Sequence, residues 1–182
     1  MDLTDILKIV VDRLRKLKIS YVLTGGLAVS FWGAPRTTHD IDIVIDAQEE
    51  DKRKILDIFK KDFYISEIAV SQAISQRFTF NIIHLKEGLK VDFWLSKKDP
   101  LRESEFRRRF KKNIFGKKIY IISPEDLILE KLLWLKESRS SKHSEDIRSI
   151  LKISRPDLNY ISGWAKKTST YDILKEILND LN

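Results

Sequence analysis

The chain has no cysteine, and among its 182 residues it has only one methionine, four prolines and six glycines. The absence of cysteine excludes disulfides, zinc–thiolate sites and cysteine nucleophiles. Since there are only three histidines, a metal site would have to be built mainly from carboxylate oxygens. No apolar run reaches the roughly eighteen residues that a membrane-spanning helix needs. The amphipathic start "MDLTDILKIVVDRLRKLKIS" is unlike a signal peptide, so we expect a soluble, cytoplasmic protein with no membrane partner.

Hydrophobic residues make up 42% of the chain, which is enough to bury a sizeable core in one domain or in one domain with a helical annex. The formal net charge is +7 and the pI is near 9.5. Such a charge fits a polyanionic ligand, and it fits a solvated, lysine-rich surface about as well.

Hydrophobic periodicity divides the chain into an α/β half, residues 1–122, and a helical half, residues 123–182. Ser123 followed by Pro124 is typical of a helix start. The fold class expected is α/β (α+β), with a short mixed sheet flanked by helices and followed by a C-terminal helical bundle. Helices are predicted over residues 3–17, 25–33, 49–63, 124–138, 143–152, 156–167 and 170–181, and strands over residues 20–24, 39–46, 77–85 and 89–96, with a hairpin over 112–123.

Two aspartates interrupt the apolar strand "HDIDIVID" at positions 40 and 42. Residues two apart in a strand share a face, so Asp40 and Asp42 project together while Ile41 and Ile43 face the other side. Asp92, in "KVDFW", is a further carboxylate within an apolar strand, and it would join the pair if the two strands were neighbours. Crowded carboxylates stay ionised when Mg²⁺ or Mn²⁺ binds them, and metal-assisted phosphoryl or nucleotidyl transfer uses this arrangement.

A double glycine, Gly25-Gly26, stands where a predicted strand meets a predicted helix. Without side chains, the backbone N–H groups and the positive helix end can approach a phosphate. A simple tight turn is the alternative explanation.

The succession of strand, Gly-Gly, helix, Asp-x-Asp strand and later strand aspartate resembles the nucleotidyltransferase superfamily that includes polymerase beta, in its minimal form. The segments "SPEDLILEKLLWLKES" and "KHSEDIRSIL" are similar to the C-terminal half of the AbiEii-type nucleotidyltransferase toxins of abortive-infection and toxin–antitoxin systems. The resemblance implies that Gly25 and Gly26 hold a nucleoside triphosphate, that Asp40 and Asp42 bind magnesium, and that the helical half contributes catalytic and nucleotide-binding residues, namely Lys131 and Asp146.

Other site residues are assigned by position or left with an alternative. Ser30 and Arg36 are expected phosphate contacts, and Asp92 is expected either to bind metal or to act as a base. Read from the residues alone, Lys131 would be a surface side chain and Asp146 a helix cap.

The expected function is transfer of a nucleoside monophosphate from an NTP to a hydroxyl group, with release of pyrophosphate. The acceptor expected first is RNA, most plausibly a tRNA end, in a toxin-like enzyme with an antitoxin protein as partner. Transfer to a small molecule such as an aminoglycoside, or to a protein, is one alternative. A non-catalytic nucleotide-binding or antitoxin-binding module is another.

The RNA hypothesis depends on residues 102–118, where eight positive charges stand against two glutamates. This stretch joins the Asp92 strand to the helix that begins at Pro124, so a polyanion bound to it could reach the metal site. A solvated charge run on a helix and hairpin is the alternative. The side chains expected to bind nucleic acid are Arg107, Arg108, Arg109, Lys111 and Lys112.

Overall fold

The computed structural model describes residues 1–181, and the chain divides into two compact units. The first contains Met1–Leu27 and Thr37–Ile121, and the second contains Ala28–Arg36 and the chain from Ile122 to its last described residue. Helix α2 (Gly25–Trp32) begins in the first unit and continues into the second. The segment 28–36 therefore groups with the C-terminal helices, although it lies far from them in the sequence.

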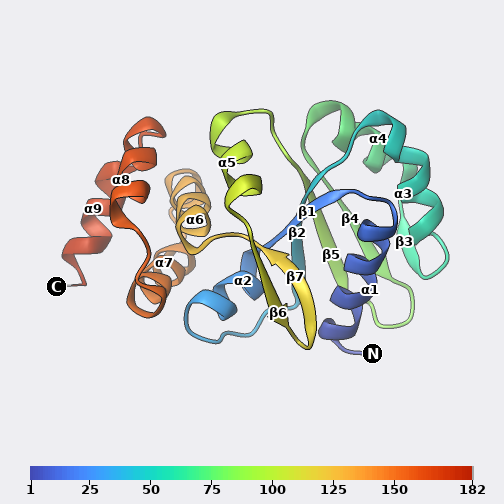
Figure 1. Cartoon of the computed structure of the whole chain (residues 1–182), viewed down its shortest axis with the longest axis horizontal. Helices are drawn as coiled ribbons and strands as arrows, with labels where there is room; N and C mark the ends of the chain where they lie inside the picture. The colour runs from blue at the N-terminus through green and yellow to red at the C-terminus, as the bar shows by residue number, and fades with distance from the viewer. Residues whose placement is uncertain (182) are drawn as a thin grey trace. The chain divides into compact units, whose positions relative to one another are not determined.

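The first unit is built on a mixed sheet with the strand order β3-β4-β5-β2-β1-β7-β6 (Figure 1). Strand β2 pairs parallel with β5 and antiparallel with β1, which in turn pairs parallel with β7. This arrangement confirms the predicted α/β class. The strands are β1 (Ser20–Thr24), β2 (Asp40–Asp46), β3 (Phe63–Ile65), β4 (Thr79–His84), β5 (Lys90–Leu95), β6 (Phe110–Ile114) and β7 (Lys117–Ile121).

Helix α1 (Leu3–Lys16) covers part of this sheet because its apolar residues recur at helical spacing. Asp2 caps the helix and Asp5 completes a reciprocal capping box. The buried stripe packs against β1 and β2, and it consists of Ile6, Leu7, Val10, Val11 and Leu14.

Between β2 and β4 the structure differs from the prediction. The helix expected over 49–63 is a short 3-10 turn (Glu49–Asp51) followed by α3 (Lys52–Phe59), and β3 follows it. Residues 67–76, for which the pattern predicted no element, form α4 (Glu67–Gln76), which Ser66 caps. The rings of Phe59 and Phe93 lie 5.8 Å apart, so α3 packs on the face of β5 that carries Phe93. That face is opposite the aspartate face.

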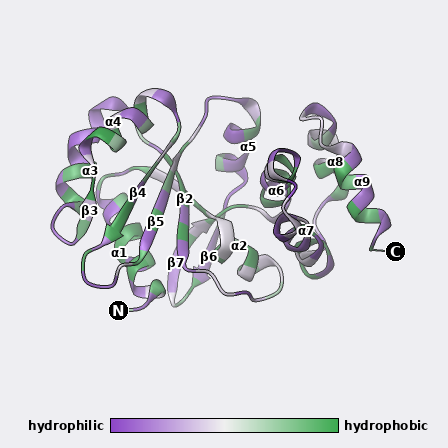
Figure 2. Cartoon of the chain, turned by 180° about the vertical axis from the view of Figure 1, so that it is seen from behind, coloured by the Kyte–Doolittle hydropathy of each residue, from purple (hydrophilic) through white to green (hydrophobic). Residues whose placement is uncertain are grey.

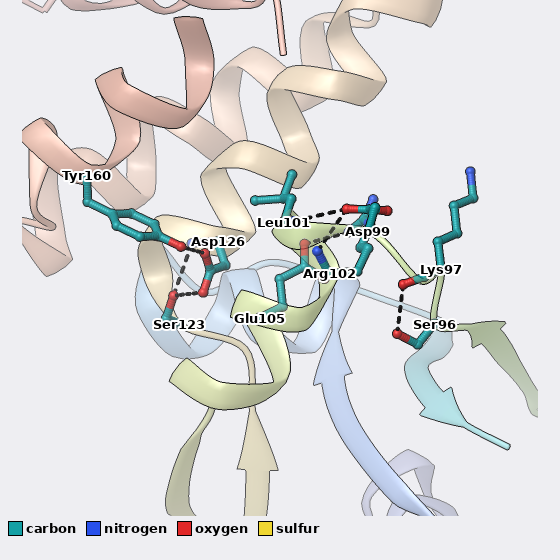
Figure 3. A network of polar contacts seen from close by, with 9 residues as sticks. All are labelled: Ser96, Lys97, Asp99, Leu101, Arg102, Glu105, Ser123, Asp126 and Tyr160. Carbon is teal, nitrogen blue, oxygen red and sulfur yellow. Dashed lines mark hydrogen bonds and ion pairs between the residues drawn. The ribbon is translucent and has the colours of Figure 1, made fainter. Parts of the chain in front are cut away.

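The charged stretch after β5 begins with a helix, α5 (Pro100–Arg108). Asp99 caps it by accepting hydrogen bonds from the backbone N–H groups of Leu101 and Arg102, and the Arg102 guanidinium pairs with the buried Glu105 at 2.6 Å (Figure 3). Strands β6 and β7 then form the expected hairpin.

The second unit contains the C-terminal helices α6 (Pro124–Ser138), α7 (Ser141–Ser154), α8 (Leu158–Lys167) and α9 (Tyr171–Asn179). Helix α6 is buried over its first nine residues and packs against the other three. Hydrophobic and hydrophilic segments alternate along α8 and α9, as expected for helices with one buried face (Figure 2).

A buried polar network fixes the start of α6 (Figure 3). Ser123 caps the helix, and its hydroxyl donates to Asp126 at 2.7 Å. The Tyr160 hydroxyl, from α8, donates to the other oxygen of Asp126 at 2.7 Å. Because Asp126 is fully buried, these bonds stabilise a carboxylate that would otherwise be costly to bury.

Across residues 1–181, none of the helices combines the length and the apolar composition that crossing a membrane requires.

Candidate active site

The aspartates of β2 lie on the half-exposed face of the central strands. The side chain of Asp40 is 48% exposed, whereas Ile41 and Ile43 are fully buried on the opposite face. Strand β5 lies beside β2 in parallel register, with Asp92 aligned with Asp42 and Lys90 aligned with Asp40. Neighbouring strands are about 5 Å apart, so Asp40, Asp42 and Asp92 occupy one small area of the sheet.

The backbone of Gly25 approaches the side chain of Asp42 closely. Gly25 has a φ of +64°, and a Cβ atom built on it would lie 1.9 Å from Asp42 Oδ2. Any side chain at position 25 would therefore overlap the carboxylate, and the backbone conformation itself favours glycine. Gly26 follows in the first turn of α2. This contact gives a physical reason for glycine at position 25.

Lys90 and Trp94, which the sequence analysis did not select, contact these carboxylates. Lys90 Nζ lies 2.8 Å from Asp92 Oδ2 and 3.7 Å from Asp40 Oδ2. The hydrogen bond to Asp92 raises the pKa of Lys90, against the opposing effect of burial. Trp94 Nε1 donates to Asp42 Oδ1 at 3.4 Å. Both residues are two positions from Asp92, so strand alternation could have identified them.

Within residues 1–181, no three His, Asp or Glu side chains are grouped closely enough to hold a metal ion by themselves. Magnesium commonly binds one or two protein carboxylates and takes its other ligands from substrate phosphates and water. Asp40 and Asp42 therefore suit magnesium in their donor chemistry, provided that a triphosphate completes the coordination.

The second unit contains another charged cluster, formed by Arg36, Lys131 and Asp146. Lys131 Nζ lies 3.0 Å from Asp146 Oδ2, and Arg36 Nε lies 3.4 Å from Asp146 Oδ1. The side chains of Lys131 and Asp146 are 9% and 5% exposed. Lys131 is thus buried rather than on the surface, and two cations share one carboxylate.

Two polar residues accompany this cluster. The Ser30 hydroxyl donates to the Arg36 carbonyl oxygen at 3.2 Å, and it accepts from the Arg36 N–H at 3.3 Å. Ser30 therefore fixes the backbone that carries Arg36. Burial lowers the pKa of His143, and the positive charge of Lys131 lowers it further. His143 was not predicted as a site residue, and its spacing of three residues from Asp146 on α7 was the available signal.

The basic stretch is partly paired within the first unit. Arg109 donates to the Phe106 carbonyl oxygen at 2.6 Å, and its guanidinium lies 4.7 Å from the Tyr120 ring centroid. The ammonium of Lys111 lies 5.6 Å from the same ring. A shallow cavity of about 390 Å³ is lined here by Phe106, Arg107, Arg109 and Tyr120.

Further along the hairpin the charges are also engaged. Lys112 lies over the Phe110 ring at 5.1 Å, Lys117 pairs with Asp12, and the Lys118 carbonyl oxygen accepts from Arg15. Cation–π and ion-pair contacts of this kind stabilise the hairpin and α1. Several of the charges counted in the sequence are thus used in packing within the unit.

The predicted site residues therefore form two sets. The first unit brings together Asp40, Asp42 and Asp92, with Gly25 and the adjoining Gly26 at their edge. It carries the predicted nucleic-acid-binding side chains in a separate place, on the stretch 107–112. The second unit brings together Arg36, Lys131 and Asp146, with Ser30 supporting Arg36.

The chain is similar to known proteins in sequence and in fold. Residues 6–129 match the family model described as aminoglycoside-2''-adenylyltransferase. No curated protein matches the chain.

Solved structures share the fold. The antibiotic-resistance factor ANT(2'')-Ia is similar at a TM-score of 0.64 and 14% identity, over 99% of this chain and 100% of that one. The lincomycin-bound lincosamide antibiotic adenylyltransferase LnuA is similar at a TM-score of 0.55 and 17% identity, over 84% of this chain and 98% of that one. An antigenic nucleotidyltransferase-like protein from Paracoccidioides brasiliensis is similar at a TM-score of 0.54 and 19% identity, over 96% of this chain and 91% of that one. These likenesses show a nucleotidyltransferase fold.

Proposed function

Because the chain belongs to the aminoglycoside-2''-adenylyltransferase family, we propose that it transfers the adenylyl group of ATP to a hydroxyl group of a small molecule. Family membership makes the chain a nucleotidyltransferase, and the ATP donor and the small-molecule acceptor are the proposal. The observation that carries it is the Asp40–Asp42 pair on the half-exposed face of β2, with the Gly25 backbone packed against Asp42.

In this reaction an oxygen of the acceptor hydroxyl forms a bond to the α-phosphorus of ATP. The bond between that phosphorus and the α,β-bridging oxygen breaks, and pyrophosphate leaves. Asp40 and Asp42 would hold magnesium, which when bound offsets the charge of the phosphates and polarises the reacting groups. Asp92 would accept the proton of the hydroxyl, because it is the third carboxylate of the same face.

We propose further that Lys131 contributes to binding of the triphosphate. Two cations around the single carboxylate of Asp146 leave excess positive charge on largely buried side chains, and an anionic phosphate would offset it. Lys131→Ala should raise the KM for ATP, whereas Lys136→Ala, an exposed lysine five residues later on α6, should not.

A small-molecule acceptor is preferred to RNA because much of the basic stretch is engaged within its own unit. Arg109 and Lys111 contact Tyr120, and Lys117 pairs with Asp12. The toxin-like hypothesis, with an antitoxin protein as partner, is not carried forward as the first candidate, because the family model that matches the chain is that of an aminoglycoside adenylyltransferase.

The test is incubation with ATP labelled at the α-phosphate, Mg²⁺ and a panel of acceptors. The panel contains aminoglycosides, lincosamides and total tRNA, and products are separated by chromatography and identified by mass spectrometry. We expect label on a small molecule, and loss of labelling in Asp42→Asn.

Asp46→Asn is the matched control, because Asp46 lies on the same strand and face but pairs with Arg77 at 3.7 Å, at the far end of β2. It should retain activity. Label on tRNA alone would replace the small-molecule acceptor with RNA, and equal labelling by Asp42→Asn and the parent would remove Asp42 from the site.

A further inference from the structure

Lys90 places a positive charge among the three carboxylates of the first unit, those of Asp40, Asp42 and Asp92. It is the first residue of β5, its register partner on β2 is Asp40, and it shares its face with Asp92. Its ammonium is 2.8 Å from Asp92 and 3.7 Å from Asp40. Of the cations in the described ion pairs, Lys90 alone contacts two of the carboxylates proposed to act in catalysis.

The ammonium lies beside Asp40, one of the two carboxylates proposed to hold a metal. Asp40, Asp42 and Asp92 would repel each other without a positive charge nearby. The one positive charge of Lys90 offsets only part of the charge of the three carboxylates. A lysine side chain is a compact point charge on a flexible four-carbon stem. The side chain of Lys90 is 37% exposed, so it is free to change its partner without opening the core.

We propose that Lys90 is a counter-ion for the carboxylates. Its ammonium holds Asp40 and Asp92 together in the metal-free enzyme, and it is displaced from them when metal and ATP bind together. This inference rests on the proposed function, in which the carboxylates hold a divalent cation. Metal alone has to compete with the ammonium for the carboxylate of Asp40, which Lys90 contacts at 3.7 Å. Metal with ATP brings phosphate oxygens, which supply ligands for the metal and a new partner for Lys90.

The consequence is that nucleotide and metal reinforce each other's binding. Metal alone must displace the ammonium, and ATP lowers the free energy of that step by giving Lys90 a new anionic partner. By thermodynamic necessity metal then increases the affinity for ATP by the same factor. The Lys90 ammonium therefore weakens metal binding in the absence of ATP. This effect depends on the charge of residue 90, rather than on the shape of its side chain.

The experiment measures binding of Mn²⁺ alone, by the electron paramagnetic resonance signal of the free ion. Lys90→Gln removes the charge and keeps a hydrogen-bond donor, and Lys90→Met removes both. Each should bind Mn²⁺ about tenfold more tightly than the parent, which corresponds to about 1.4 kcal/mol. Lys90→Arg keeps the charge, so its Mn²⁺ affinity should stay within about twofold of that of the parent.

Lys117→Met is the matched control, because it also removes one positive charge of the first unit. Its lysine–aspartate pair, with Asp12, lies away from the carboxylate face. This variant should leave Mn²⁺ affinity unchanged. Thermal melts in a chelator should place Lys90→Met below Lys117→Met, with the difference removed by saturating Mn²⁺.

Equal Mn²⁺ affinity of the parent and both uncharged Lys90 variants would overturn the counter-ion role and leave the proposed function standing, provided that Asp42→Asn still abolishes binding. Absence of Mn²⁺ binding in every variant, with and without a non-hydrolysable ATP analogue, would overturn both.

Discussion

Replacement of Gly25 by alanine tests the close approach between the start of α2 and Asp42. A residue with a Cβ atom at a φ of +64° carries a conformational cost of about 1–2 kcal/mol. The new Cβ would also lie 1.9 Å from Asp42 Oδ2, so either the carboxylate or the helix start must move. Overpacking of this kind costs about 1–3 kcal/mol more. The expected total loss is about 2–5 kcal/mol of the free energy of unfolding.

Gly88 provides a control with a similar φ angle and no contact. Its φ is +66°, and a Cβ atom there would have nothing within 4 Å. Gly88→Ala should therefore show the conformational cost alone. For a chain of this size, 1 kcal/mol corresponds to about 2–4 °C in Tm, so Gly25→Ala should melt roughly 2–12 °C below Gly88→Ala.

The assay is thermal unfolding followed by circular dichroism, together with the adenylyl-transfer assay. Gly25→Ala should lose transfer activity because Asp42 is displaced, and Gly88→Ala should keep it. Equal melting temperatures and equal activities for the two variants would refute the contact between position 25 and Asp42.

Three further predictions concern the second unit. Asp146→Asn should cost about 3–5 kcal/mol in urea unfolding, because two cations would be left without their carboxylate; a loss below about 1 kcal/mol would contradict that role. Tyr160→Phe should cost about 1.5–3 kcal/mol, because it removes a hydrogen bond to the buried carboxylate of Asp126, whereas Tyr64→Phe, at an exposed position, should be neutral. Since the pKa of His143 is lowered in the folded state, the unfolded state takes up its proton first, so stability should fall as pH drops below about 6.5. His143→Gln should reduce that fall between pH 7.5 and 5.5, and an unchanged pH dependence would exclude His143 as its source.

Much of the carboxylate site was accessible from local sequence pattern. Alternation in "DIDIVID" assigns Asp40 and Asp42 to one face and the isoleucines to the other, because successive side chains in a strand point to opposite sides. The same rule applied to "KVDFW" would have added Lys90. The capped start of α6 was also predictable, because Ser123, Pro124 and the acids of the first turn act over a few residues.

Local pattern was less informative in two places. One is a helix with a weak hydrophobic periodicity, and the other is the basic stretch, where the number of charges says nothing about the residues that contact them. Helix α4, "EIAVSQAISQ", was missed, since polar and apolar residues alternate there without a clear stripe. The basic stretch suggested a nucleic-acid surface, but Arg109, Lys111 and Lys117 have partners on other elements. A count of charges does not contain those contacts.

The sequence by itself determined the α/β class, the aspartate face of β2 and the glycine turn, because strand alternation, helix periodicity and capping depend on near neighbours. Only the tertiary structure decided that β5 pairs with β2 in the register that aligns Lys90 with Asp40 and Asp92 with Asp42. It also decided that residue 36 pairs with residue 146 in a unit separate from the sheet. Such pairings join residues that are fifty to over one hundred positions apart, and they are selected by the burial and hydrogen bonding of the whole chain rather than by local preference.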